Sequence, residues 1–224
     1  MQLKPLHKGR FQDHWQDNHS LIEQVVLSCI SEEKIIEEKS PLMSQGQQLN
    51  YLTLVRSGKV SIGYTAQNGR SFQLGTMECD YQVFGEMEFF SSYRCQLDII
   101  AEETLTVAFI CADKLQQALV KNPQVALFFA SAIAIDYQDT VNILIHRMLY
   151  PIAYNVAYDL YQQYLRDFPV GGFTKSYMEA ERFGTTDRVY RRAVKELTDL
   201  GLVERSKQGL SITDIDALKR YLAL

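Results

Sequence analysis

A basic segment near the C-terminus holds the residue types best suited to binding another molecule. Its cations fall within two turns of a helix expected to start after Gly184: Arg188, Arg191, Arg192 and Lys195. An arginine side chain can pair with the edge of a guanine, and a threonine hydroxyl can donate to a phosphate oxygen. Thr185 and Thr186 precede the cations, and threonine also caps helix N-termini. These residue types favour binding in the major groove of double-stranded DNA.

The sequence around these cations predicts two short helices joined by a tight turn. Apolar residues recur at helical spacing before Gly184, and glycine readily adopts the left-handed conformation that ends a helix. The expected inward stripe of the second helix is Val189, Ala193, Val194 and Leu197. The pattern therefore predicts a helix-turn-helix. An αα-hairpin with a solvated basic face is the alternative that the pattern alone leaves open.

A short hairpin is expected directly after the second helix. Val203-Glu204-Arg205 predicts a strand, Ser206 to Gly209 a turn, and Leu210-Ser211-Ile212 the returning strand. A helix-turn-helix followed by a hairpin is a winged helix. The run from Gly184 to Leu197, continued by Leu200-Gly201-Leu202-Val203, resembles without a gap the recognition-helix segment of the Crp/Fnr family of bacterial transcription regulators.

This resemblance implies a homodimer that binds a palindromic operator in double-stranded DNA and has RNA polymerase as a further partner. The expected phosphate contacts come from Thr185, Thr186 and Lys207. The expected groove-facing residues are Asp187, Arg188, Arg191 and Arg192. Arg192 coincides with a base-reading arginine of the family, and Asp187 could accept a hydrogen bond from a cytosine amine. The charges of Asp187 and Arg188 differ from those at the matching positions of the best-known family member. The DNA sequence that this member recognises therefore cannot be assigned to this chain.

Short alternating segments fill the region from Ile35 to about Leu115. Glycines separate them, and hairpins are expected at Ser57-Gly58 and at Gln67-Asn68-Gly69-Arg70. Many evenly spaced short strands predict a small antiparallel barrel or jelly roll. The runs Ser44-Gln45-Gly46 and Val83-Phe84-Gly85-Glu86 also resemble the effector domain of the Crp/Fnr family. With the winged helix, the resemblance covers nearly the whole chain.

The resemblance places an effector pocket at Gly85, Glu86, Glu88 and Arg94. Glu86 matches the glutamate that takes the ribose in members that bind cyclic nucleotides, although its role could be limited to satisfying backbone groups of the barrel. Glu88 adds a second carboxylate, and the segment before Arg94 is about one residue short. Two carboxylates and one displaced arginine make a poor anion site. We therefore expect no control by cyclic AMP, and an unidentified uncharged or cationic effector or the protein's own abundance as the signal. The run from Gly85 to Glu88 also resembles the YeiL-like branch of the family.

A long helix is expected from Gln124 to Tyr150, between Pro123 and Pro151. It is apolar on more than one face, whereas a helix that packs against a single domain needs only one apolar face. One stripe is expected to pack against a second copy of the chain: Ile133, Tyr137, Val141, Leu144 and Met148. The alternative is a helix buried within a single chain. The family resemblance also points to a dimer through this helix.

Together these segments predict an α+β fold. Its parts are an N-terminal antiparallel β-barrel of the cyclic-nucleotide-binding jelly-roll type, a long dimerisation helix and a C-terminal winged helix-turn-helix. The expected domains are residues 1–122, 123–150 and 151–224. Within the first domain, residues 1–34 are expected to form an amphipathic pair of helices.

Composition fits a cytoplasmic protein that carries no cofactor. The 224 residues are 46% hydrophobic, with no 18-residue apolar run and no N-terminal signal pattern, so we expect a soluble protein outside the membrane. The cysteines are widely spaced, and we expect isolated thiols rather than a metal site at Cys29, Cys79, Cys95 and Cys111. Net charge is −4, but basic residues outnumber acidic ones by eight to six from Thr174 to Gly209. A mildly basic segment in an otherwise acidic protein is typical of a protein that binds its partner through that one surface.

A different class of function remains as the alternative. The barrel could hold a small molecule, as a sensor or an enzyme, while the C-terminal domain mediates protein interactions. An enzyme would need a nucleophile with a base, or a metal constellation. The sequence shows no Ser/His/Asp order, no glycine-rich phosphate loop and no His/Cys cluster. We therefore expect no enzymatic activity.

Overall fold

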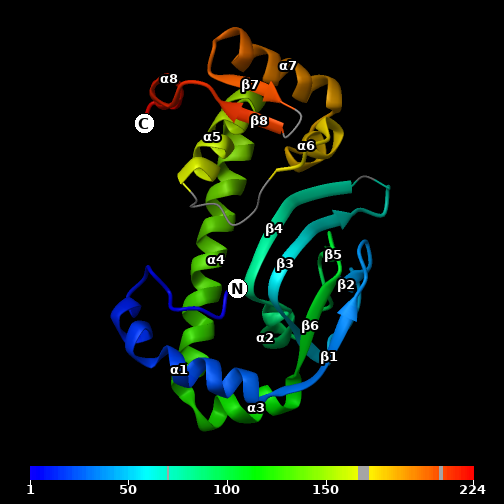
Figure 1. The fold of residues 1–224 in the computed structure, drawn as a ribbon, viewed down its shortest axis with the longest axis vertical. Coiled ribbons are helices and arrows are strands. Elements are labelled where there is room, and N and C mark those ends of the chain that lie inside the picture. The colour runs from blue at the N-terminus through cyan, green and yellow to red at the C-terminus, as the bar shows by residue number, and fades with distance from the viewer. Residues whose placement is uncertain (70, 166–171, 207–208) are drawn as a thin grey trace. The chain divides into compact units, whose positions relative to one another are not determined.

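The computed structural model describes residues 1–69, 71–165, 172–206 and 209–224 (Figure 1). The chain divides into two compact units. One contains Met1–Val60 and Cys79–Val141, and the other contains Ser61–Glu78 and Asn142–Leu224. Each unit has its own hydrophobic core.

The first unit begins with one helix, α1 (Gln12–Ser28), in place of the predicted pair. Its buried stripe is Trp15, Ile22 and Val26. The residues after α1 form strand β1 (Ile30–Ile36), which pairs with β6 (Leu105–Cys111). The prediction of helix through residue 34 is wrong because pairing with β6 overrides the local preference of Glu32, Glu33 and Lys34, which are residue types that strands usually lack.

A six-stranded antiparallel sheet is the main β-structure of the chain. Besides β1 and β6 it contains β2 (Pro41–Met43), β3 (Tyr51–Thr65), β4 (Ser71–Phe84) and β5 (Asp98–Ala101). The strand order is β1-β6-β3-β5-β2, and β4 pairs with β3. The sheet curls into a half-barrel (Figure 1), which confirms the predicted antiparallel barrel architecture.

Glycines explain one confirmed hairpin and one wrong prediction. The turn after β3 contains Gly69, which has φ +78° and donates its N–H to the Ala66 carbonyl at 2.9 Å. Arg70, the last residue of the predicted turn, lies outside the described residues. At Ser57-Gly58, by contrast, β3 continues without a turn. Gly58 has φ +116°, and a Cβ atom there would lie 2.2 Å from Cδ2 of Leu105. The positive φ and the close approach of the Leu105 side chain both favour glycine at this position within the strand.

Helices pack on the sheet to close the core of the first unit. Glu86–Ser91 forms the short helix α2, Ala112–Lys121 forms α3 and Pro123–Leu149 forms α4. The Trp15 ring meets the Phe128 ring edge to face, with centroids 5.6 Å apart. Burying one large apolar side chain in such a core stabilises the fold by about 1.5–3 kcal/mol.

The apolar character of α4 raises the question of a membrane span. In the described part of the chain, no single helix is both long and apolar enough to cross a membrane. Helices α3 and α4 meet that criterion only when they are taken together across a bend of 112°.

The second unit contains the predicted helix-turn-helix and its wing. Its elements after α4 are α5 (Ile152–Leu165), α6 (Ser176–Arg182), α7 (Asp187–Asp199), β7 (Val203–Ser206), β8 (Gly209–Ile212) and α8 (Ile215–Leu222). Strands β7 and β8 pair antiparallel, with Val203 opposite Ile212. Gly184 ends α6 with φ +61°, as the sequence predicts.

The buried stripe of α7 differs from the prediction at one residue. Tyr190 is 2% exposed and lies in the core with Ala193, Val194 and Leu197, whereas Val189 is 44% exposed. Positions 190, 193, 194 and 197 follow the i, i+3, i+4, i+7 spacing of one helix face. Val189 lies about 100° around the helix from Tyr190, so its predicted inward position is wrong.

We expect Gly58→Ala to destabilise the protein more than Gly46→Ala. Both glycines have positive φ, but a Cβ atom at Gly46 would have no atom within 4 Å. The control should cost about 1–2 kcal/mol of unfolding free energy for its left-handed backbone. Gly58→Ala should cost about 1–3 kcal/mol more because its Cβ overlaps Leu105. Urea unfolding of the two variants measures the difference, and equal losses would contradict the packing role of Gly58.

Candidate functional site

The N-terminus of α7 is fixed by the turn that precedes it. The Thr185 N–H donates to the Ala180 carbonyl at 2.9 Å, which ties the turn to α6. Thr186 is the N-cap of α7, and its Oγ1 accepts from the Val189 N–H at 3.4 Å. Threonine is suited to this position because its oxygen satisfies a backbone donor that has no partner within the helix.

Asp187, the first residue of α7, is bonded on both sides within the protein. Its Oδ1 accepts from the Ser176 hydroxyl at 2.7 Å, and its Oδ2 lies 2.8 Å from Nη2 of Arg191. Ser176 begins α6, so the first contact joins the two helices of the motif. The Ser176 hydrogen bond, followed by the Arg191 guanidinium, lowers the pKa of Asp187. The carboxylate is therefore ionised at neutral pH.

The outward side of α7 carries its cations. The exposed residues of this helix between positions 188 and 195 are Arg188, Val189, Arg191, Arg192 and Lys195. Arg188 and Arg192 form no ion pair with any residue that the structure describes, whereas Arg191 is held by Asp187. The structure thus brings the predicted groove-facing residues together on one helix. Lys207 lies outside the described residues.

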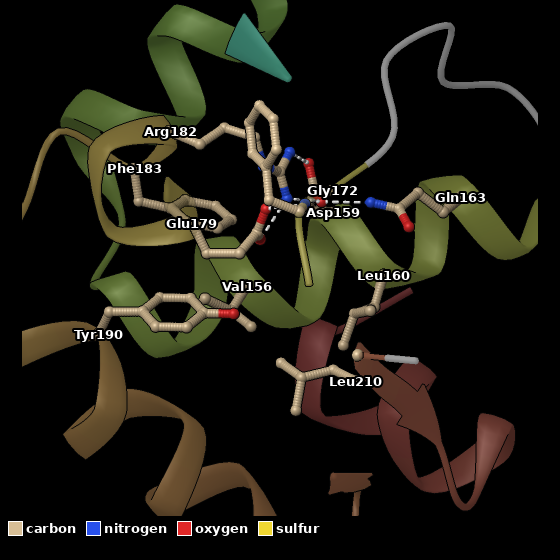
Figure 2. Close-up of a pocket in the computed structure, with 12 residues that line it drawn as sticks. Val156, Asp159, Leu160, Gln163, Gly172, Glu179, Arg182, Phe183, Tyr190 and Leu210 are labelled. Atoms are coloured by element: carbon tan, nitrogen blue, oxygen red, sulfur yellow. Dashed lines mark hydrogen bonds and ion pairs between the residues drawn. The ribbon is translucent and has the colours of Figure 1, made fainter. Parts of the chain in front are cut away.

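A buried ionic cluster lies behind the helix-turn-helix, and sequence reasoning did not find it. Arg182 of α6 is 1% exposed. Its Nη1 donates to Oδ1 of Asp159 at 2.8 Å, its Nη2 to Oδ2 at 2.5 Å, and its Nε to Oε1 of Glu179 at 3.0 Å. Figure 2 shows the guanidinium with both carboxylates and Gln163, whose amide donates to Asp159 at 2.7 Å.

The two carboxylates keep the buried guanidinium charged. Burial alone would lower the pKa of Arg182, but Asp159 and Glu179 raise it above its ordinary value. Nearby, burial and the charge of Arg182 lower the pKa of Arg147 to about 10. Arg182 therefore stays charged at any physiological pH, and it joins α6 to α5.

The cluster borders a cavity of about 100 Å³. Helices α5, α6 and α7 and strand β8 contribute its walls, with Leu160 and Tyr190 among the apolar ones (Figure 2). Its charged groups already bond to one another, and the Phe173 N–H donates to Glu179 at 2.5 Å. We therefore assign the cluster a positioning role rather than a ligand-binding role.

The predicted effector residues are bonded within the first unit. Glu86 is 9% exposed, and its Oε1 accepts from the Met1 amino group at 2.8 Å. Asp136 of α4 lies 3.6 Å from the same amino group. Burial would lower the pKa of this ammonium, but Glu86 and Asp136 raise it above its ordinary value. Glu86 therefore faces a cation of the chain itself.

The other predicted pocket residues also have partners nearby. Gly85 has φ +93° and is the N-cap of α2. Oε1 of Glu88 accepts from the Gln96 N–H at 3.4 Å, and exposed Arg94 donates to the Gly46 carbonyl at 3.0 Å. No sequence signal indicated the Met1–Glu86 contact, because the two residues are 85 positions apart.

The stripe predicted to form a dimer is partly exposed along α4. Ile133 and Val141 are half-buried, whereas Tyr137, Leu144 and Met148 are 59%, 48% and 82% exposed. Isolated exposed apolar residues are ordinary, but a row at helical spacing marks a surface suited to a partner.

The cysteines are free thiols in this structure. Cys29, Cys79 and Cys95 are buried, and Cys111 is half-buried. Among the described residues, no group of three or more His, Cys, Asp or Glu side chains could hold a metal ion.

Comparison with known proteins gives the same architecture. Residues 33–122 match the cyclic nucleotide-binding domain family. The c-di-GMP responsive global regulator CLP of Xanthomonas campestris is 17% identical, with a TM-score of 0.68 over 87% of this chain and 99% of that chain. A CooA mutant from Carboxydothermus hydrogenoformans is also 17% identical, with a TM-score of 0.68 over 99% of each chain.

A transcriptional regulator of the CRP family from Thermus thermophilus is 16% identical, with a TM-score of 0.61 over 85% of this chain and 97% of that chain. No curated protein matches the chain in sequence. Residues 33–122 thus form a domain of the cyclic nucleotide-binding type. The chain as a whole has the fold of the Crp/Fnr transcription regulators, which confirms the resemblance found in the sequence.

We expect Arg182→Leu to destabilise the protein by about 3–5 kcal/mol, because it leaves two buried carboxylates without their cation. Arg192→Leu is the matched control, since it removes an exposed cation and should change the unfolding free energy by less than about 0.5 kcal/mol. Urea unfolding measures both. A loss for Arg182→Leu no larger than that of the control would show that the cluster does not hold α6.

Proposed function

We propose that the protein is a transcription regulator of the Crp/Fnr type that binds a specific DNA sequence as a homodimer. The fold supports this function class, and the surface of α7 supports the DNA contact. Arginine is the side chain most often used to recognise guanine in the major groove. The observation that carries the proposal is the exposed face of α7, where Arg188 and Arg192 follow a capped helix start.

The expected roles follow from the positions of these residues. Thr185, Thr186 and Lys207 contact phosphates, and Arg188, Arg191, Arg192 and Asp187 lie toward the groove. Phosphate contacts fix the register of the protein on the duplex, while contacts to base edges select the sequence. The acidic remainder of the chain limits non-specific binding, because the protein's net charge is −4.

Selection of bound sequences from random DNA should recover a two-fold symmetric site with half-site centres about 34 Å apart. Arg192→Ala should weaken binding by about 1–3 kcal/mol and relax the preference at one base pair of each half-site. Lys219→Ala is the matched control, because it also removes one cation from the second unit but lies on α8. The groove assignment is wrong if the Arg192 variant selects the same sequence with the same affinity.

The exposed stripe on α4 supports the homodimer. We expect Val141→Glu to shift the protein toward monomer, because two like charges would face each other in an apolar seam at a cost of several kcal/mol, on the order of 2–7 per unpaired polar group. Asn142→Glu is the control, since exposed Asn142 lies toward another side of the helix. Light scattering at low concentration measures the assembly, and a wild-type monomer would refute this part of the proposal.

Regulation without cyclic AMP is the third part of the proposal. A carboxylate a few ångströms from a phosphodiester repels it by about 0.5–1 kcal/mol in solvated surroundings. Glu86 and Glu88 both lie in this region, and Arg94 donates to a backbone carbonyl. An uncharged or cationic ligand, or the abundance of the protein, would then provide the signal.

We expect no binding of cyclic AMP or cyclic GMP at micromolar concentrations and DNA binding that needs neither nucleotide. Isothermal titration of the purified protein measures the first, and a gel shift with and without nucleotide measures the second. Micromolar heats that Arg94→Ala abolishes would instead show a working phosphate site.

A further inference from the structure

We propose that Val189 reads a thymine in each DNA half-site by contacting its C5-methyl group, next to the guanine that Arg192 reads. The inference rests on the proposed DNA binding and specifies the sequence that α7 prefers. It starts from the exposure of Val189, which is 44% in a helix whose other apolar residues near it are buried.

The helix geometry places Val189 beside Arg192. The two residues are three positions apart, and residues with this spacing are neighbours on a helix surface. Tyr190, Ala193 and Val194 occupy the inward side, so Val189 lies at the border of the cationic face. A base contacted by Val189 should therefore be adjacent in the site to the base contacted by Arg192.

The chemistry of valine selects the base. A valine side chain neither donates nor accepts hydrogen bonds, and the thymine methyl is the one apolar group that ordinary bases present in the major groove. Valine is also stiff in a helix, where one χ1 rotamer dominates, so little side-chain entropy is lost on binding. Contact with a cytosine amine or a guanine oxygen would instead remove water from a polar group without replacing its hydrogen bond.

Asp187 is less suited to reading a base. Both of its carboxylate oxygens are already bonded, one to Ser176 at 2.7 Å and the other to Arg191 at 2.8 Å. A carboxylate oxygen can accept a second hydrogen bond, but the Ser176 and Arg191 contacts already fix the orientation of this carboxylate within the protein. Asp187 is therefore a positioning residue, which leaves Arg188, Val189 and Arg192 to read the sequence.

The test removes one methyl group from the DNA. After selection with the full-length protein, each recurrent thymine of the recovered site is replaced in turn by uracil, which differs only in lacking the C5-methyl. Loss of one buried methyl should weaken wild-type binding about fourfold at the thymine next to the Arg192 guanine. Val189→Ala changes both subunits of the proposed homodimer, so it should bind about 16-fold more weakly to the thymine site and show no further loss with uracil.

Lys219→Ala on α8 is the control, because it leaves α7 unchanged, and it should keep the full uracil penalty. The inference is overturned if wild-type protein binds the thymine and uracil sites equally, or if Val189→Ala keeps the penalty. Folding is not at risk in Val189→Ala because the side chain is exposed. Recovery of no preferred sequence by the wild-type protein would instead refute the proposed function itself, so the two failures are distinguishable.

Discussion

The buried pairing of Arg182 with Asp159 and Glu179 is the interaction on which the helix-turn-helix depends. Helix α6 has seven residues, well below the roughly 12–15 at which an isolated helix becomes stable in water. Its position must therefore come from tertiary contacts. A guanidinium that bonds two carboxylates in a buried site accepts few other arrangements, because any displacement leaves an uncompensated charge. The Ser176–Asp187 hydrogen bond links α6 to the first residue of α7, so the position of α6 also fixes the start of α7.

Internal pairing also occurs in the barrel, at the residues predicted to form the effector pocket. Residues 33–122 have the fold of such a domain, but fold and ligand are independent properties of a protein. Glu86, one of the predicted effector residues, is paired with the Met1 amino group, and Asp136 adds a second carboxylate. The local charge is thus arranged around a cation, whereas a cyclic nucleotide would bring an anion.

Periodic features of the sequence were sufficient to predict the helix-turn-helix, the wing, the long helix and the turn at Gly69. Those features depend on neighbouring residues, and their physical signals are local. The Ser57-Gly58 prediction failed because a glycine required by contact with Leu105 looks the same in sequence as one required by a turn. The Arg182 cluster was missed because charged residues on short helices are usually solvated, and only the fold brings Asp159, 23 positions away, to the guanidinium.

The assignment of Val189 shows how a one-residue error in a helical stripe changes a functional interpretation. Tyr190 occupies the inward position because positions 190, 193, 194 and 197 share one face, and this moves an apolar side chain among the cations. In the proposed DNA complex, a protein with a net charge of −4 would gain less from attraction to phosphates, and contacts to base edges would contribute a larger share of the binding free energy. Because Asp187 holds Arg191, the proposed recognition of bases would depend on a few side chains, and each of them would then have a large effect on sequence specificity.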